Sequence, residues 1–280
     1  MLQCAKSIKR RVAMPRRIRK ITIHKSNSIV RGGDSLSVHG KRALNAIYYL
    51  IQLNANDGKA EAIEKMTYIP LPFPYLRKMM KLENVESYTR EIEKALTELQ
   101  QPIQLNNFKN PRDGQIYNWY SISIIAEASW KMDNNKKIAY VALSPLAKWL
   151  MLNTHENFTK LELIDVVNKL RTKYAMKLYE YLKSFGSYRY IDIEQKHILK
   201  LLGLPEDHKT YKHYAKLKAL IERQLREISE KTDLKKVTLT DRKEFSKKKV
   251  FRILINPKAE KKTANKQKIE EMVEAITKKI

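Results

Sequence analysis

The chain has 280 residues, 43% of them hydrophobic, which is enough for two domains of ordinary size with a buried core. Lysine and arginine number 56 against 30 acidic residues, and the formal net charge of +26 disfavours a compact state unless nucleic acid or, alternatively, an anionic membrane surface neutralises it. The single cysteine, Cys4, excludes an internal disulfide and a cysteine-rich zinc site, and the lack of an apolar run of ~18 residues excludes a membrane span.

The N-terminal segment, residues 1–25, is rich in lysine and arginine and has no acidic residue. A block of this kind is typical of a flexible arm that contacts nucleic acid, although a solvated tail without a specific contact is the open alternative. It lacks the apolar stretch of a secretory signal, so we expect a cytoplasmic protein in a reducing compartment.

From residue 35 onward, apolar residues recur at helical or strand spacing, and turns or prolines separate the periodic segments. The proline-rich stretch at 68–74 suits only an edge strand or a connector. Ser144 and Pro145 are the residue types preferred at the N-cap and the first position of a helix. The expected elements of this half are helices at 35–53, 74–82, 86–100 and 145–152, and strands at 117–125 and 138–143 with a turn at 132–137 between them.

The second half shows the same kinds of signal. Gly186 and Gly203 follow helical patterns and are expected to end helices, and Pro257 ends the periodic region. The expected elements of this half are helices at 174–185, 194–202 and 210–231, and strands at 190–193, 237–240 and 250–255.

The order helix, short extended segment, helix, turn, longer helix and hairpin occurs in both halves. This is the winged helix-turn-helix plan, so the predicted fold is α+β, with two tandem winged helix-turn-helix domains related as a pseudo-repeat. The expected limits are a flexible arm at 1–25, a first domain at 26–153, a second at 154–257 and a lysine-rich tail at 258–280. The tail ends in a short amphipathic helix, either docked on the second domain or offered to a partner.

The helix expected at 210–231 has two chemically different faces when residues are placed 100° apart. Apolar residues from Tyr214 to Ile228 fall on one face, which we expect to lie in the core. In a winged helix-turn-helix this helix enters the major groove, so its outward and flanking residues are the candidate DNA readers. These candidates are Thr210, Lys212, His213, Lys216, Ala219, Leu220, Arg223 and Arg226.

The hairpin tip after this helix forms a basic wing, which we expect to contact phosphates and to raise affinity for any sequence. Its candidate residues are Arg242, Lys243, Lys247, Lys248 and Lys249. The equivalent helix of the first domain is net negative between Glu83 and Leu99. We therefore expect the first domain to mediate self-association, with an accessory DNA contact from Arg90, Lys94 or the basic arm.

The sequence does not contain the motifs of the enzyme classes that we considered. Gly33 and Gly40-Lys41 are wrongly spaced for a phosphate-binding loop, and Arg42 follows in place of serine or threonine. The histidines form no closely spaced pair that could hold a metal for a nicking nuclease. We therefore expect no catalytic residues, no metal and no cofactor.

The second half resembles the C-terminal half of plasmid replication initiators of the iteron-binding type. The residues that carry the resemblance are Tyr174-Ala175, Leu178-Tyr179 and Leu182, then Leu202-Gly203-Leu204 with a following tyrosine, and Glu227-Ile228 before Thr232-Asp233. The segments 27–50 and 144–163 resemble the same family more loosely, so that the resemblance spans about 26–255. One departure concerns the run at 216–219, where many relatives are continuously basic. This chain has Leu217 and Ala219 there.

The resemblance implies two winged-helix domains and binding to double-stranded direct repeats at a plasmid origin. It also implies help in opening the duplex, recruitment of the host replication initiator and the replicative helicase, and a homodimer through the first domain that represses its own promoter. A winged-helix transcriptional repressor without an origin function remains the alternative, and a nicking enzyme is a third hypothesis.

Overall fold

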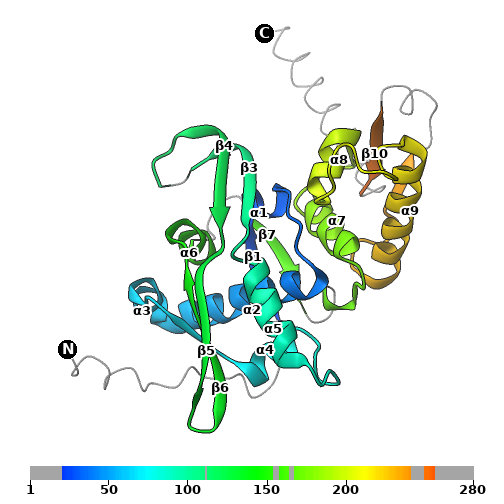
Figure 1. Cartoon of the computed structure of the whole chain (residues 1–280). Helices are drawn as coiled ribbons and strands as arrows, with labels where there is room; N and C mark the ends of the chain where they lie inside the picture. The colour runs from blue at the N-terminus through cyan, green and yellow to red at the C-terminus, as the bar shows by residue number, and fades with distance from the viewer. Residues whose placement is uncertain (1–20, 111, 154–157, 164–166, 241–248, 256–280) are drawn as a thin grey trace, which may run out of the picture.

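The computed structural model describes residues 21–110, 112–153, 158–163, 167–240 and 249–255 (Figure 1). It is an α+β structure of two winged helix-turn-helix units that follow each other along the chain. The elements of the first unit are β1 (Thr22–Ser26), α1 (Asn27–Arg31), α2 (Val38–Asn54), α3 (Ala60–Lys65), β2 (Ile69–Pro72), α4 (Phe73–Met79), α5 (Tyr88–Glu98), β3 (Pro102–Lys109), β4 (Ile116–Ser123), β5 (Ile125–Asp133), β6 (Lys136–Leu143), α6 (Pro145–Leu152) and β7 (Phe158–Glu162). Those of the second unit are α7 (Lys173–Lys183), β8 (Tyr190–Glu194), α8 (Gln195–Leu201), α9 (Tyr214–Lys231), β9 (Thr238–Thr240) and β10 (Val250–Leu254).

The two units repeat one sheet topology. In the first unit the antiparallel order is β2-β6-β5, and in the second it is β8-β10-β9. In each case the strand that precedes the helix-turn-helix lies at one edge, and the later of the two strands that follow it in the sheet, β6 or β10, lies in the middle. The helices α2, α4 and α5 correspond in order to α7, α8 and α9. The expected pseudo-repeat is therefore confirmed, and the proline-rich segment is the edge strand β2.

The strand pairing of the first unit differs from the expected hairpin of 117–125 with 138–143. The hairpin is instead β5–β6, and its turn is Asn134-Asn135 with φ angles of 46° and 60°. Two left-handed asparagines make the tight turn that fits the twist of a hairpin. The earlier run, β4, pairs with β3 in a separate two-stranded ribbon (Figure 1). The sequence analysis assigned no element to β3, although Ile103, Gln104 and Leu105 alternate between apolar and polar as expected for a half-buried strand.

The first strand lies in a segment that was expected to belong to the flexible arm. β1 pairs antiparallel with β7, from Thr22 opposite Glu162 to Ser26 opposite Phe158. Lys25, counted among the basic residues of the arm, is only 2% exposed. β1 and β7 form a two-stranded sheet of their own, separate from the sheet β2-β6-β5. Residues 1–20 and the tail at 258–280 lie outside the described residues.

Helix α9 begins four residues later than expected. The ring nitrogen Nδ1 of His208 accepts hydrogen bonds from the backbone N–H groups of Thr210 and Tyr211, both at 3.2 Å. These bonds fix a turn over the residues that the periodicity assigned to the helix, and His213 becomes the N-cap residue. The spacing of apolar residues does not reveal such a turn. Histidine is also not a usual capping residue, so nothing in the sequence signals that the helix starts after His213.

A single continuous hydrophobic core joins the two units. In the second unit Leu217, Ile221 and Ile228 of α9 pack in this core, and the ring of Tyr214 stacks on Phe251 at 4.5 Å between centroids. Such stacking fixes the first turn of α9 against β10. Within the described part of the chain, no helix has the length and apolar character needed to cross a membrane.

Candidate nucleic-acid interface

Helix α9 presents opposite faces to the core and to solvent. Its inward residues Leu217, Ile221 and Leu225 are at most 2% exposed. The expected outward residues Lys216, Ala219, Arg223 and Arg226 are all exposed, and so is Lys212 in the turn before the helix. The two-sided pattern read from the sequence is therefore present, whereas the contact of this face with DNA remains a prediction.

The structure places four of the expected reader residues differently from the sequence analysis. Leu220 is 3% exposed and belongs to the core, so its side chain faces away from solvent and from any bound base. Thr210 and Lys212 are exposed but lie in the turn before α9, and His213 is the exposed N-cap residue.

Polar contacts with α7 and the residues just before it hold α9 in place. The Thr172 hydroxyl donates to Gln224 Oε1 at 2.5 Å, and the Arg171 backbone N–H donates to Glu227 Oε1 at 2.8 Å. Gln224 is 1% exposed, so this bond satisfies a polar group inside the core. The sequence reading missed Gln224, although its position seven residues after Leu217 places it on the apolar face.

The C-terminal end of α9 has a second anchor. The Tyr179 hydroxyl donates to Asp233 Oδ1 at 2.8 Å, and Lys183 forms an ion pair with the same carboxylate. Burial and the Asp233 carboxylate raise the pKa of Tyr179, so its hydroxyl remains a hydrogen-bond donor. The contacts at Gln224, Glu227 and Asp233 thus hold the C-terminal half of α9 and the direction in which its outward face points.

Only one of the expected wing residues lies in the described part of the chain. Lys249 is exposed, has a φ of 52°, and its carbonyl accepts from the backbone N–H of Gln195 at 2.8 Å. The backbone just before β10 is thereby connected to the first residue of α8. The expected residues Arg242, Lys243, Lys247 and Lys248 lie outside the described residues.

The first unit uses several of its acidic residues internally. Glu93 accepts from the Trp130 ring N–H at 2.6 Å, and Glu98 accepts from the backbone N–H of Ser37 at 2.9 Å. Arg90 and Lys94 are exposed on α5, as an accessory DNA contact requires. Two carboxylates of this helix are therefore held by hydrogen bonds within the unit, although they keep their negative charge.

The wing of the first unit was not predicted to be basic, yet it carries a cluster of lysines. Lys137 donates to the Thr89 hydroxyl at 2.9 Å and lies 5.2 Å from the centroid of the Trp130 ring. Lys131 lies over Tyr140, and Lys136 is exposed beside the turn. The expected turn at 132–137 already contained Lys136 and Lys137, but the sequence analysis assigned these lysines no role.

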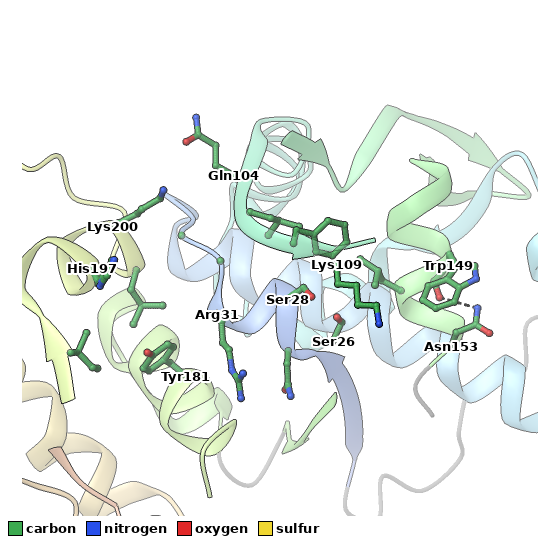
Figure 2. Close-up of a pocket in the computed structure, with 18 of the residues that line it drawn as sticks. Ser26, Ser28, Arg31, Gln104, Lys109, Trp149, Asn153, Tyr181, His197 and Lys200 are labelled. Carbon is green, nitrogen blue, oxygen red and sulfur yellow. Dashed lines mark hydrogen bonds between the residues drawn. The ribbon is translucent and has the colours of Figure 1, made fainter. Parts of the chain in front are cut away.

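A groove with a volume of about 940 Å³ is lined by residues of both units. Figure 2 shows the residues that line it. Its floor is the segment 26–33, which includes Arg31. The labelled residues on its two sides are Gln104, Lys109, Trp149 and Asn153 from the first unit, and Tyr181, His197 and Lys200 from the second. None of the described residues that line the groove is acidic. Lysine and arginine without a neighbouring carboxylate favour an anionic ligand here.

The decisive comparison is with a family model described as "Initiator Replication protein, WH1". It matches residues 22–183, more than half of the chain. The chain belongs to this replication initiator family. The match covers the whole first unit and continues through α7 of the second. The initiator therefore combines a family-matched N-terminal winged helix with a second winged helix that carries the basic outward face of α9. Its family is one of DNA-binding replication initiators and not a typical enzyme family.

Two crystal structures of domains 2 and 3 of RctB are similar to the initiator at low identity. One, a selenomethionine derivative, is 12% identical, with 87% of this chain and 94% of that chain covered and a TM-score of 0.42. The other is 13% identical, with 86% and 94% covered and a TM-score of 0.41. A likeness this loose adds nothing to the family assignment. No curated protein sequence matches the initiator.

Proposed function

We propose that the initiator binds repeated double-stranded sites at a plasmid origin through α9 and its wing, helps to open the duplex and recruits the host replication initiator and the replicative helicase. The observation that carries this proposal is the exposed basic face of α9 opposite a fully packed apolar face. Family membership supports the origin-associated role. Footprinting on the DNA flanking the gene tests it, because an initiator of this type protects short direct repeats.

Lys216 and Arg223 are the strongest candidates for base contacts. They are seven residues apart and exposed, so they lie two turns apart on the same face of α9. Lysine and arginine side chains that enter the major groove pair best with the O6 and N7 acceptors of guanine. Ala219 lies between them and presents a methyl group, which suits a thymine methyl. We infer that the site combines guanines with a thymine in the half that α9 reads.

Replacing Lys247, Lys248 and Lys249 with alanine is expected to lower affinity for specific and random duplexes by similar factors. Phosphate contacts release counterions, so losing up to three of them should also flatten the dependence of log K on log salt by about 0.9 per contact. Fluorescence anisotropy titrations at several salt concentrations measure both effects. A loss confined to the specific site would contradict the role of the wing as a phosphate contact.

We infer that the first unit dimerises through the free edge of β4. Among the described residues only β3 pairs with this strand, and the segment Ile116–Ser123 contains no charged residue and no proline. Ile116 and Trp119 are 68% and 61% exposed. An uncharged, unpaired strand is a template for pairing with another strand. Each copy has a net charge of +26, so two copies repel one another. The electrostatic repulsion is weakest where an uncharged strand edge meets its equivalent. The dimer would then repress the initiator's own promoter.

Trp119→Lys is expected to convert the dimer into a monomer in sedimentation velocity, because it places a charge in the paired edge. Tyr188→Lys is the matched control, since Tyr188 is a similarly exposed aromatic residue, at 58%, in the second unit. The control should leave the dimer intact. A wild-type chain that sediments as a monomer at every concentration would refute the dimer itself.

A further inference from the structure

Buried charged side chains join the two units, and Asp34 is at their centre. Its Oδ1 lies 2.5 Å from Lys41 Nζ of α2, and its Oδ2 lies 2.8 Å from Lys177 Nζ of α7. The side chains of all three residues are at most 8% exposed. Burial alone would raise the pKa of Asp34, but Lys177 and Lys41 outweigh it and hold the pKa well below its usual range. The carboxylate therefore stays charged between the units.

A second buried pair crosses the same boundary with the charges reversed. Lys25 of β1 lies 2.8 Å from Glu180 Oε1 of α7, with the two side chains 2% and 3% exposed. The first unit thus offers a carboxylate to Lys177 and an ammonium to Glu180, one helical turn further along α7. Sliding α7 by one turn would place Glu180 near Asp34 or Lys177 near Lys25. Each wrong register brings like charges together in a buried site, which is unfavourable.

Two glycines at the same boundary let the backbones of the two units pack in direct contact. A Cβ atom on Gly33 would lie 2.4 Å from the Lys200 carbonyl oxygen. A Cβ atom on Gly203 would lie 2.3 Å from the carbonyl oxygen of Asp34. Arg31 adds a hydrogen bond to the Ser184 carbonyl oxygen at 3.0 Å. The loop that carries Asp34 is thus packed directly against the second unit.

A contribution to folding stability does not explain these buried ion pairs well. A buried ion pair loses hydration when it forms, so an apolar pair of similar volume is often at least as stable. The neighbouring face of α2 also contains buried polar atoms with no hydrogen-bond partner among the described residues, namely both amide atoms of Asn45 and the Tyr48 hydroxyl. Buried polar groups of this kind are best attested as devices that select one register.

We propose that Asp34, Lys177, Lys25 and Glu180 are positioning residues that hold the two winged-helix units in one relative orientation. The DNA contacts of α9 and those of Arg90 and Lys94 on α5 then fall at a fixed spacing along the duplex. The fixed spacing of the DNA contacts rests on the proposed function, whereas the fixed relative orientation of the two units does not. The initiator should therefore discriminate against sites in which the two contacted segments are separated by extra base pairs.

A charge swap tests the orientation without DNA. Spin labels are placed at Thr97→Cys on α5 and Glu230→Cys on α9, both exposed, in a Cys4→Ser background. Distance measurements on the free protein should give a narrow distribution for the otherwise wild-type chain and a broad one for Lys25→Glu. The double variant Lys25→Glu with Glu180→Lys should restore the narrow distribution at the original distance. Glu61→Lys is the control, because its pair with Lys65 is surface-exposed, at 80% and 74%, and it should change nothing.

An unchanged distribution in Lys25→Glu would overturn the proposal. If Lys25→Glu fails to fold, Asp34→Asn and Glu180→Gln replace it as uncharged variants with the same expected broadening. The DNA part uses duplexes with about five base pairs, half a helical turn, inserted inside the protected segment. Wild type should lose at least tenfold in affinity, and the folded single variants should lose less than threefold. If distances broaden as expected but wild type binds no duplex, the positioning role stands and the proposed function fails.

Discussion

Alanine in place of Lys216 or of Arg223 is expected to weaken binding to the specific duplex by roughly 1–3 kcal/mol each, a loss of about 5- to 150-fold. Both side chains are exposed on the face of α9 opposite the core, and they lie two turns apart. A long cation in the major groove loses a direct contact to a base edge when it is truncated. Binding to random duplex should fall by much less, because each change removes only one positive charge.

The matched control is Lys65→Ala on α3, which removes an equally exposed lysine from the first unit. It should leave the specific affinity within twofold of wild type. Competition titrations of the specific site against random duplex measure the ratio that matters. Equal losses on specific and random DNA for both α9 variants would refute the assignment of α9 as the recognition helix.

Gly203→Ala is expected to destabilise the folded chain by about 2–4 kcal/mol, adding left-handed strain to overpacking. Gly203 has a φ of 65°, a conformation that residues with a Cβ rarely adopt. The added Cβ would also meet backbone atoms at Asp34 and Ser35 within 3.0 Å, which no side-chain rotation can relieve. The loss should therefore exceed that of an ordinary surface glycine.

Gly58→Ala and Gly114→Ala separate the cost of the left-handed backbone from the cost of overpacking. These glycines have φ angles of 77° and 72°, and a Cβ on either would meet nothing within 4 Å. Each should cost only about 1 kcal/mol, the cost of the left-handed backbone alone. Urea unfolding at equilibrium measures all three variants. Equal losses would contradict the close packing of Gly203 against the first unit.

The sequence predicts the two-sided nature of α9 well, because helical periodicity alone separates Leu217 and Ile221 from Lys216 and Arg223. It also predicts the edge position of β2, since a strand with Pro70 and Pro72 cannot occupy the middle of a sheet. The predictions from sequence that the structure corrected were wrong for local reasons. Leu220 lies on the flank of the apolar stripe, and only the packed core decides that it is buried. The turn fixed by the His208 ring is invisible to periodicity.

The buried lysines could not have been predicted from the sequence. Lys25, Lys41 and Lys177 are at most 3% exposed, although lysine is almost never fully buried without a partner. Lys25 and Lys177 pair with Glu180 and Asp34 from distant parts of the chain, and only the fold brings these partners together. Lys41 pairs with Asp34, seven residues before it. Lys25 in particular follows a basic segment and shares its composition, so nothing in its neighbours distinguishes it from a solvated residue.

The central claim is that α9 of the initiator recognises short direct repeats in duplex DNA. Footprinting on the DNA flanking the gene tests it most directly, with wild type compared against the double variant Lys216→Ala with Arg223→Ala. We predict that wild type protects a series of equally spaced direct repeats and that the double variant loses this protection. Protection confined to a lone inverted repeat, or unchanged protection by the double variant, would contradict the account.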